Sequence, residues 1–172
     1  IIQVYEVGTA TMMAAKGAVK PVYQLMAENN EKFDPKVYIP TITGYYSTSD
    51  GRMLSLPFNS STSVMYYNKD AFKKAGLDPE KPPVTWPEFF EMAKKLKASG
   101  MEGGFSTNWI SWIQLENFSA WHNLPFGTKS NGFDGLDTVL QFNGPLQLKH
   151  FTNMYNASKE KVFVYGGREN KA

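Results

Sequence analysis

The sequence predicts an α/β fold with a mainly parallel sheet, and three observations favour it. Runs rich in β-branched and aromatic residues alternate with stretches of helical periodicity, as they do in this fold class. The predicted helices begin at residues that cap helices, such as Thr9 or Thr11 after the first strand, at residues 1–5. The chain has 172 residues, 42% of them hydrophobic, which is enough to bury a core.

The first half of the chain contains several short elements. A helix is predicted over residues 22–28, because apolar residues share one face there. Residues 37–46 contain Pro and Gly and fit either a loop or a short helix. A turn at 47–52 then leads into a strand at 53–58.

Residues 56–77 change character twice. Hydroxyl side chains occupy positions 60–63, and the apolar run at 64–67 predicts a buried strand. Asp70 is the expected N-cap of a short helix that Gly76 ends. The stretch is either a central strand with a bulge or a segment that crosses between two lobes.

A capping box marks the start of the next helix. Thr85 precedes Pro87 and Glu88, the pattern of a hydroxyl N-cap with a carboxylate at N3, and Gly100 ends this helix. The remaining expected elements are a strand at 103–106, a helix at 108–123, a Gly-rich loop at 126–135, and a helix from Pro145 with Leu148, Phe151 and Tyr155 on one face.

The composition excludes several classes of protein. A net charge of +2 argues against a nucleic-acid surface, and the absence of cysteine rules out a disulfide framework. No apolar run approaches the ~20 residues of a membrane span. No nucleotide-binding Gly motif occurs, and His122 and His150 lack metal-ligand spacing. We therefore expect no cofactor and no metal, and we expect both histidines to be surface or capping residues.

Several motifs resemble those of a known family. The sequence Leu-Pro-Phe-Asn-Ser-Ser-Thr is followed by Tyr-Asn-Lys-Asp and then by Pro-Pro-Val-Thr-Trp. Together they resemble the extracellular solute-binding proteins of bacterial ABC importers. Gln-Val-Tyr-Glu-Val-Gly-Thr-Ala near the start and Trp-Ile-Ser-Trp later resemble the members that bind sn-glycerol-3-phosphate. The resemblance covers nearly the whole chain and fades after about Tyr155.

The resemblance implies a periplasmic-binding-protein-like (type II) two-lobe fold, truncated at both ends. Residues 1–62 would belong to the first lobe and end in the crossing, and residues 63–172 would belong to the second lobe. The chain opens inside a predicted strand and family members are typically longer, so we expect a fragment. Its unpaired sheet edges would favour self-association.

The resemblance also implies the function and its site. The protein would be periplasmic, would capture glycerol-3-phosphate or a related polyol phosphate without catalysis, and would deliver it to an ABC permease in the inner membrane. The ligand-binding residues it implies are Glu6, Ser61, Trp109 and Trp112.

The residues themselves leave alternatives at each of these positions. Glu6 at a strand end can accept hydrogen bonds from a diol or can complement a helix dipole. Ser61 can donate to a phosphate oxygen, although turn chemistry explains most such serine runs. Trp109 and Trp112, with Glu116 on the same stripe, can form a wall against a polyol or belong to the core.

Three other interpretations stay open at this point. The protein could bind another solute such as a sugar or oligosaccharide. It could be a fragment of a carbohydrate-active enzyme that uses Glu6 with Glu116, or a domain that mediates only protein contacts. Phosphate recognition usually rests on a bidentate Arg, and neither Arg52 nor Arg168 lies in a matching motif. We therefore expect the isolated chain to bind glycerol-3-phosphate weakly or not at all.

Overall fold

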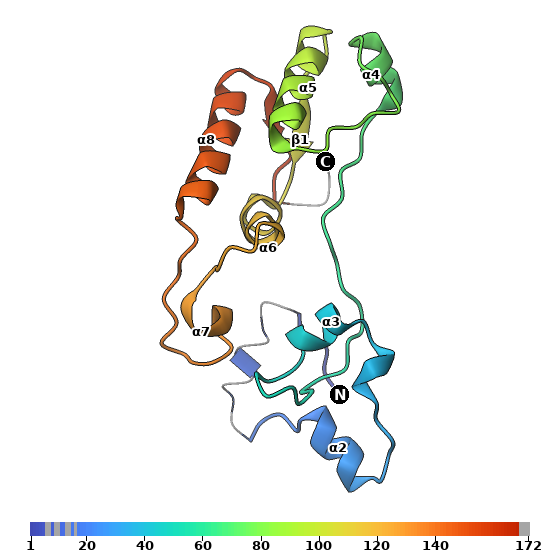
Figure 1. The fold of residues 1–172 in the computed structure, drawn as a ribbon, viewed down its shortest axis with the longest axis vertical. Helices are drawn as coiled ribbons and strands as arrows, with labels where there is room; N and C mark the ends of the chain where they lie inside the picture. Colours follow the sequence, from blue (N-terminus) through green and yellow to red (C-terminus); the bar gives the residue numbers. More distant parts are fainter. Residues whose placement is uncertain (6–7, 9–10, 13–14, 16, 169–172) are drawn as a thin grey trace. The chain divides into compact units, whose positions relative to one another are not determined.

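The computed structural model describes residues 1–5, 8, 11–12, 15 and 17–168. Its residues form two compact units, one of residues 1–62 with 127–140 and one of residues 63–126 with 141–172. Their assignment to the lobes of a binding protein stays a prediction. The elements in chain order are α2 (Val22–Glu28), η2 (Pro35–Val37), α3 (Pro40–Tyr45), α4 (Lys69–Lys74), α5 (Trp86–Ala98), β1 (Phe105–Thr107), η3 (Ser111–Asn117), α6 (Phe118–Trp121), α7 (Thr128–Asn131), α8 (Pro145–Lys159) and β2 (Phe163–Tyr165) (Figure 1).

The core of the second unit lies between a small sheet and two helices. Strands β1 and β2 pair in parallel, and Phe105 stacks on its register partner Phe163 with ring centroids 5.0 Å apart. Ala93 of α5 and Met154 of α8 are both 2% exposed and pack in the same cluster. Figure 1 shows α5 and α8 running beside these strands. Helices packed on parallel strands agree with the predicted mixed α/β character.

Helix α5 begins at the predicted capping box. The Thr85 hydroxyl accepts from the Glu88 backbone N–H at 3.4 Å, and the Glu88 carboxylate accepts from the backbone N–H of Thr85 at 3.1 Å. Gly100 follows the helix with φ +94°, a conformation that favours glycine. Both expectations for this helix are confirmed.

Helix α4 begins two residues earlier than expected. The Asn68 side chain, not Asp70, accepts from the backbone N–H groups of Asp70 and Ala71, at 2.9 and 3.0 Å. Asp70 lies in the first turn, where its charge complements the helix dipole. Gly76 ends the helix with φ +72°, as predicted.

The first unit contains the predicted helix over Val22–Glu28, with those bounds. Its N-terminus is fixed by the backbone N–H of Val22, which donates to Leu54 at 3.0 Å. Residues 37–46 form the short helix α3 rather than a loop alone. Residues 127–140 complete this unit, and Phe133 packs edge-on against Tyr45 with centroids 5.6 Å apart.

Three predicted strands are absent. Residues 1–5 and 64–67 form no strand, and of residues 53–58 only Met53 makes an isolated antiparallel bridge, to Ser47. The run at 64–67 is not buried either, since Tyr66 is 93% exposed. A β-branched and aromatic composition favours a strand only where a neighbouring chain segment supplies hydrogen bonds, and no described residue forms a ladder with residues 1–5 or 64–67.

Two later helices differ in detail from the prediction. The helix expected at 108–123 consists of a π-helix, η3, continued by α6. Helix α8 begins at Pro145 as predicted, but Leu148 and Tyr155 are each 58% exposed. Its inward face instead carries Gln147, His150, Met154 and Ala157. Two of these four residues are polar, so the apolar residues of the sequence did not mark the buried face of α8.

Two negative findings apply to the described ranges. Every helix there is too short or too polar to cross a bilayer. Among the same residues, no three His, Cys, Asp or Glu side chains gather as metal ligands would.

Candidate functional site

The structure describes three of the four expected ligand-binding residues. Glu6 lies outside the described residues. Ser61 is exposed, in the segment 56–68, which has neither helix nor strand. Nearby, the hydroxyl oxygen of Ser63 is buried and has no hydrogen-bond partner among the described residues. An unpaired buried hydroxyl costs about 1–3 kcal/mol.

Trp109 and Trp112 lie together in the second unit. Their ring centroids are 6.3 Å apart and the planes meet at 76°, an edge-to-face contact. Trp109 is 43% exposed, and Trp112 is half-buried. The two rings therefore form a partly open aromatic surface rather than part of the core.

Trp109 lies at the junction between a bend and the helix that carries Trp112. Trp109 precedes the helix and has φ +40°, which is uncommon for any residue but glycine. Its carbonyl accepts from the backbone N–H of Ile113 at 2.9 Å. The chain thus bends sharply between β1 and η3, and the bend presents Trp109.

The last described residues of the chain hold this bend from the other side. The backbone N–H of Trp109 donates to Gly167 at 3.2 Å, and the indole N–H donates to the carbonyl of Arg168. The backbone N–H of Gly166 donates to Thr107 at 2.9 Å. Arg168 thus lies beside the indole pair, although its sequence matches no phosphate-binding motif.

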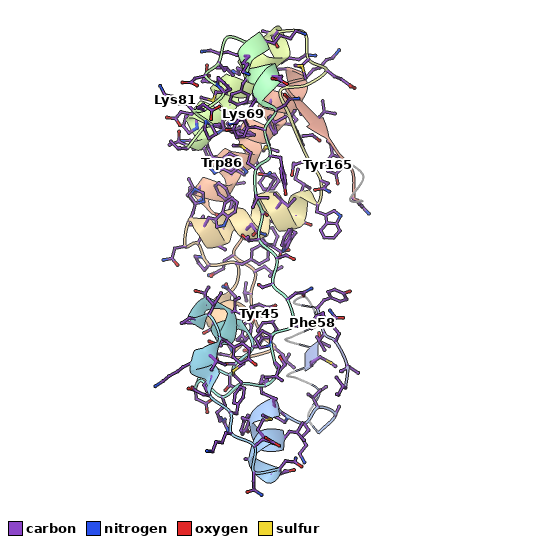
Figure 2. The ribbon with its side chains drawn as sticks, turned by 90° about the vertical axis from the view of Figure 1, so that its right-hand side faces the viewer. Tyr45, Phe58, Lys69, Lys81, Trp86 and Tyr165 are labelled. Carbon is purple, nitrogen blue, oxygen red and sulfur yellow. The ribbon has the colours of Figure 1, made fainter. Side chains whose placement is uncertain are left out.

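His150, expected to be a surface or capping residue, is instead buried. His150 is 3% exposed and stacks on Phe118 with centroids 4.0 Å apart. Trp86, labelled in Figure 2 at the start of α5, packs against the same imidazole with ring centroids 4.5 Å apart. Burial, with a smaller contribution from the charge of His122, lowers the pKa of His150 to about 4. His122 caps α6, as expected, with its Nδ1 on the carbonyl of Phe118.

The charged groups of the expected site are few. Partial burial raises the pKa of the Glu116 carboxyl above its ordinary value. Arg52 lies in the first unit, where it pairs with Asp50 at 2.7 Å and its guanidinium carbon lies 5.3 Å from the ring centre of Tyr23. Hydrogen bonds from Thr48 and then Arg52 lower the pKa of Asp50, so the guanidinium of Arg52 is already engaged.

The first unit has a shallow pocket of about 280 Å³ near the serine run. Phe58 forms part of its wall and is 82% exposed (Figure 2). Ser60 lies at the same pocket, one residue from Ser61. Apart from Asn59 and Ser60, the lining is mainly apolar: Val37, Tyr38, Ile39, Ile42, Pro57 and Phe58.

The chain matches one family model and several relatives that share one name. The model of the family described as bacterial extracellular solute-binding protein matches residues 1–171. The sn-glycerol-3-phosphate-binding periplasmic proteins UgpB of Escherichia coli K12 and of Shigella flexneri are each 58% identical to this chain over 173 residues. The match covers 100% of this chain and 39% of the length of each relative.

Proposed function

Because the chain belongs to the bacterial extracellular solute-binding protein family, we propose that it captures sn-glycerol-3-phosphate in the periplasm and delivers it to an ABC permease. The observation that carries this proposal is the 58% identity to periplasmic proteins named for binding that ligand. The function is solute capture, as in the relatives' names, and not catalysis. Glycerophosphodiesters share the same glycerol-phosphate group and fit the same proposal.

The proposed site residues have three chemical roles. The carboxylate of Glu6 accepts hydrogen bonds from the glycerol hydroxyls. It does not contact the phosphate, because two neighbouring anions repel each other. The hydroxyl of Ser61 donates to a phosphate oxygen. Trp109 and Trp112 offer flat apolar surface to the C–H groups of the glycerol backbone.

The described geometry supports the aromatic part of this proposal. The indole pair is partly open, and its bend is held by backbone hydrogen bonds from residues 166–168. A rigid aromatic surface loses little conformational entropy when a ligand settles on it. Closure of two lobes around the ligand would bring Glu6 and Ser61 to the same molecule.

The test uses a full-length background. The matching 173-residue stretch of the E. coli relative is replaced by this chain, and glycerol-3-phosphate binding is measured by calorimetry. We expect saturable binding that Trp109→Ala weakens at least tenfold, about 1.4 kcal/mol. Trp121→Ala is the matched control, because Trp121 is also exposed (54%) but lies at the end of α6. No binding by the transplanted protein, or equal losses from both substitutions, would contradict the proposal.

The second candidate ligand is a sugar or oligosaccharide. The half-exposed indole pair favours it, because aromatic rings bind the C–H face of any polyol. Competition in the same transplanted protein separates the two candidates. Maltose that displaces glycerol-3-phosphate at comparable concentration would favour the sugar.

A further inference from the structure

A continuous chain of hydrogen bonds runs from the core of the second unit to the residue before Trp109. His150 Nε2 lies 2.9 Å from Gln114 Oε1, and Gln114 Nε2 donates to Thr107 Oγ1 at 3.4 Å. The Thr107 hydroxyl in turn donates to the carbonyl of Asn108 at 3.1 Å. Since an amide oxygen only accepts, His150 Nε2 is the donor, and every bond in the chain points toward Asn108.

Gln114 is the centre of this chain and is 7% exposed. A buried amide is costly unless both its ends are bonded, and here one end reaches α8 while the other reaches the end of β1. The side chain therefore connects two elements on either side of η3. Removing the Gln114 side chain would leave the buried imidazole N–H of His150 without this acceptor.

The bend that Gln114 supports is conformationally strained. A non-glycine residue with positive φ is energetically unfavourable and persists only where its surroundings over-determine it. At Trp109 those surroundings are the hydrogen bonds that it donates to the carbonyls of Gly167 and Arg168 on one side and the Thr107–Asn108 bond on the other. The π-helix begins two residues after Trp109, and π-helical turns are frequent at functional sites.

We infer that Gln114 is a positioning residue, which fixes the Thr107–Trp109 bend through its two hydrogen bonds and so holds the indole pair in place. The inference rests on the proposed function, in which that pair contacts the ligand. Gln114 itself touches no ligand in this scheme. Its effect on binding is transmitted through Thr107 and the carbonyl of Asn108.

The structure provides a matched control for this role. Gln147 of α8 is also buried (3% exposed), and its amide donates to Ser119 Oγ at 3.3 Å. Its partner lies in α6 and not at the bend. Gln114→Met and Gln147→Met each replace a buried amide by an apolar side chain of similar length. The first removes two hydrogen bonds and the second removes one.

The experiment records the indole N–H signals of the 172-residue chain by ¹⁵N NMR, with the Trp109 signal identified by Trp109→Phe. Because the Trp109 indole donates to Arg168, its signal reports the position of the ring directly. We expect Gln114→Met to move the Trp109 signal and Gln147→Met to leave it in place. If both substitutions move it, or neither does, Gln114 has no positioning role.

A second substitution keeps the test decisive if Gln114→Met does not fold. Thr107→Val removes the hydroxyl that links Gln114 to Asn108 and preserves the side chain's shape. It should move the same Trp109 signal, and an unchanged signal would overturn the inference.

Ligand binding is measured separately, in the transplanted full-length protein. There Gln114→Met should weaken glycerol-3-phosphate binding about fivefold, the worth of one typical hydrogen bond. If the unsubstituted transplant binds no glycerol-3-phosphate, the proposed function fails while the NMR result still decides the positioning role. If the transplant binds glycerol-3-phosphate and Gln114→Met leaves the Trp109 signal unchanged, the positioning role is wrong and the proposed function stands.

Discussion

At the scale of single residues, His150 shows how burial changes the chemistry of a side chain. Its imidazole is enclosed by Phe118 and Trp86 and donates to Gln114. Burial disfavours the charged form, which is why its pKa falls to about 4 from an ordinary value of 6.5. Of the charged groups, His122 adds to the effect, since a second cation nearby opposes protonation.

This pKa predicts how stability depends on pH. Above pH 6.5 the imidazole is neutral in both the folded and the unfolded chain, so it contributes no pH dependence. As the pH falls from 6.5 to 4, the unfolded chain takes up a proton that the folded chain refuses, and stability decreases. The loss reaches about 3 kcal/mol. Urea unfolding of the second unit, followed by tryptophan fluorescence at several pH values, measures it.

A non-titrating substitution is the control for this prediction. His150→Gln should lower stability at pH 7, because it removes the ring contacts, but should flatten the decline between pH 6.5 and 4. Carboxylates elsewhere contribute equally to both proteins and cancel in the comparison. Parallel pH profiles for the two proteins would show that His150 is not the group responsible.

The candidate site was only partly predictable from single residues. Trp109 and Trp112 were predicted to share one side, and their rings do contact each other, although Trp109 itself has a positive φ that the sequence did not indicate. Gln114 and His150 could not be found in this way, because they lie 36 positions apart and a lone histidine has no spacing pattern. The buried face of α8 includes the polar residues Gln147 and His150, so no periodic pattern of apolar residues in the sequence indicates it.

At the scale of elements, the close approach of β1 and α5 fixes the core of the second unit. The chain enters β1 at Gly104, whose backbone N–H donates to Val162 at 2.7 Å. A Cβ atom at this position would lie 2.1 Å from the carbonyl oxygen of Ala93 in α5. Only a glycine lets the strand and the helix pack at this distance.

Gly104→Ala should therefore destabilise the second unit by about 2 kcal/mol or more, because backbone atoms must move to admit the methyl group. Gly100→Ala is the matched comparison at the end of α5. It meets no atom within 4 Å but has φ +94°, so it should cost about 1 kcal/mol. Tryptophan fluorescence in a urea titration measures both. A Gly104 cost no larger than that of Gly100 would contradict the packing argument.

The elements that were predicted correctly are those with local signals. The capping box at Thr85 and Glu88, and the glycines that end α4 and α5, act within a few residues of the chain. The strands at 1–5 and 64–67 failed because a strand depends on a partner that the local sequence does not specify. The π-helix also escaped prediction, since its residue types are those of an ordinary helix.

At the scale of the whole chain, the buried side chains are unevenly divided between the two units. In the described part of the first unit, the buried hydrophobic residues are Val22 and Met53. The second unit has more: Phe72, Ala93, Phe118, Met154, Ala157, Val162 and Phe163. Many large hydrophobic side chains, such as Phe58 and Tyr66, are exposed. The expected self-association stays a prediction that sedimentation analysis can test.

This distribution predicts that the two units unfold separately, the first one more easily, because buried apolar surface supplies most of the stabilising free energy. Met154→Ala should destabilise the second unit by about 2–5 kcal/mol, because the residue is 2% exposed in the centre of the core cluster. Hydrogen exchange measured by mass spectrometry should then show faster exchange in peptides from residues 63–126 and 141–168. Peptides from residues 17–62 should exchange as they do in the unsubstituted chain. Val22→Ala should give the reverse pattern, and faster exchange throughout the chain from either substitution would mean that the two units fold as one.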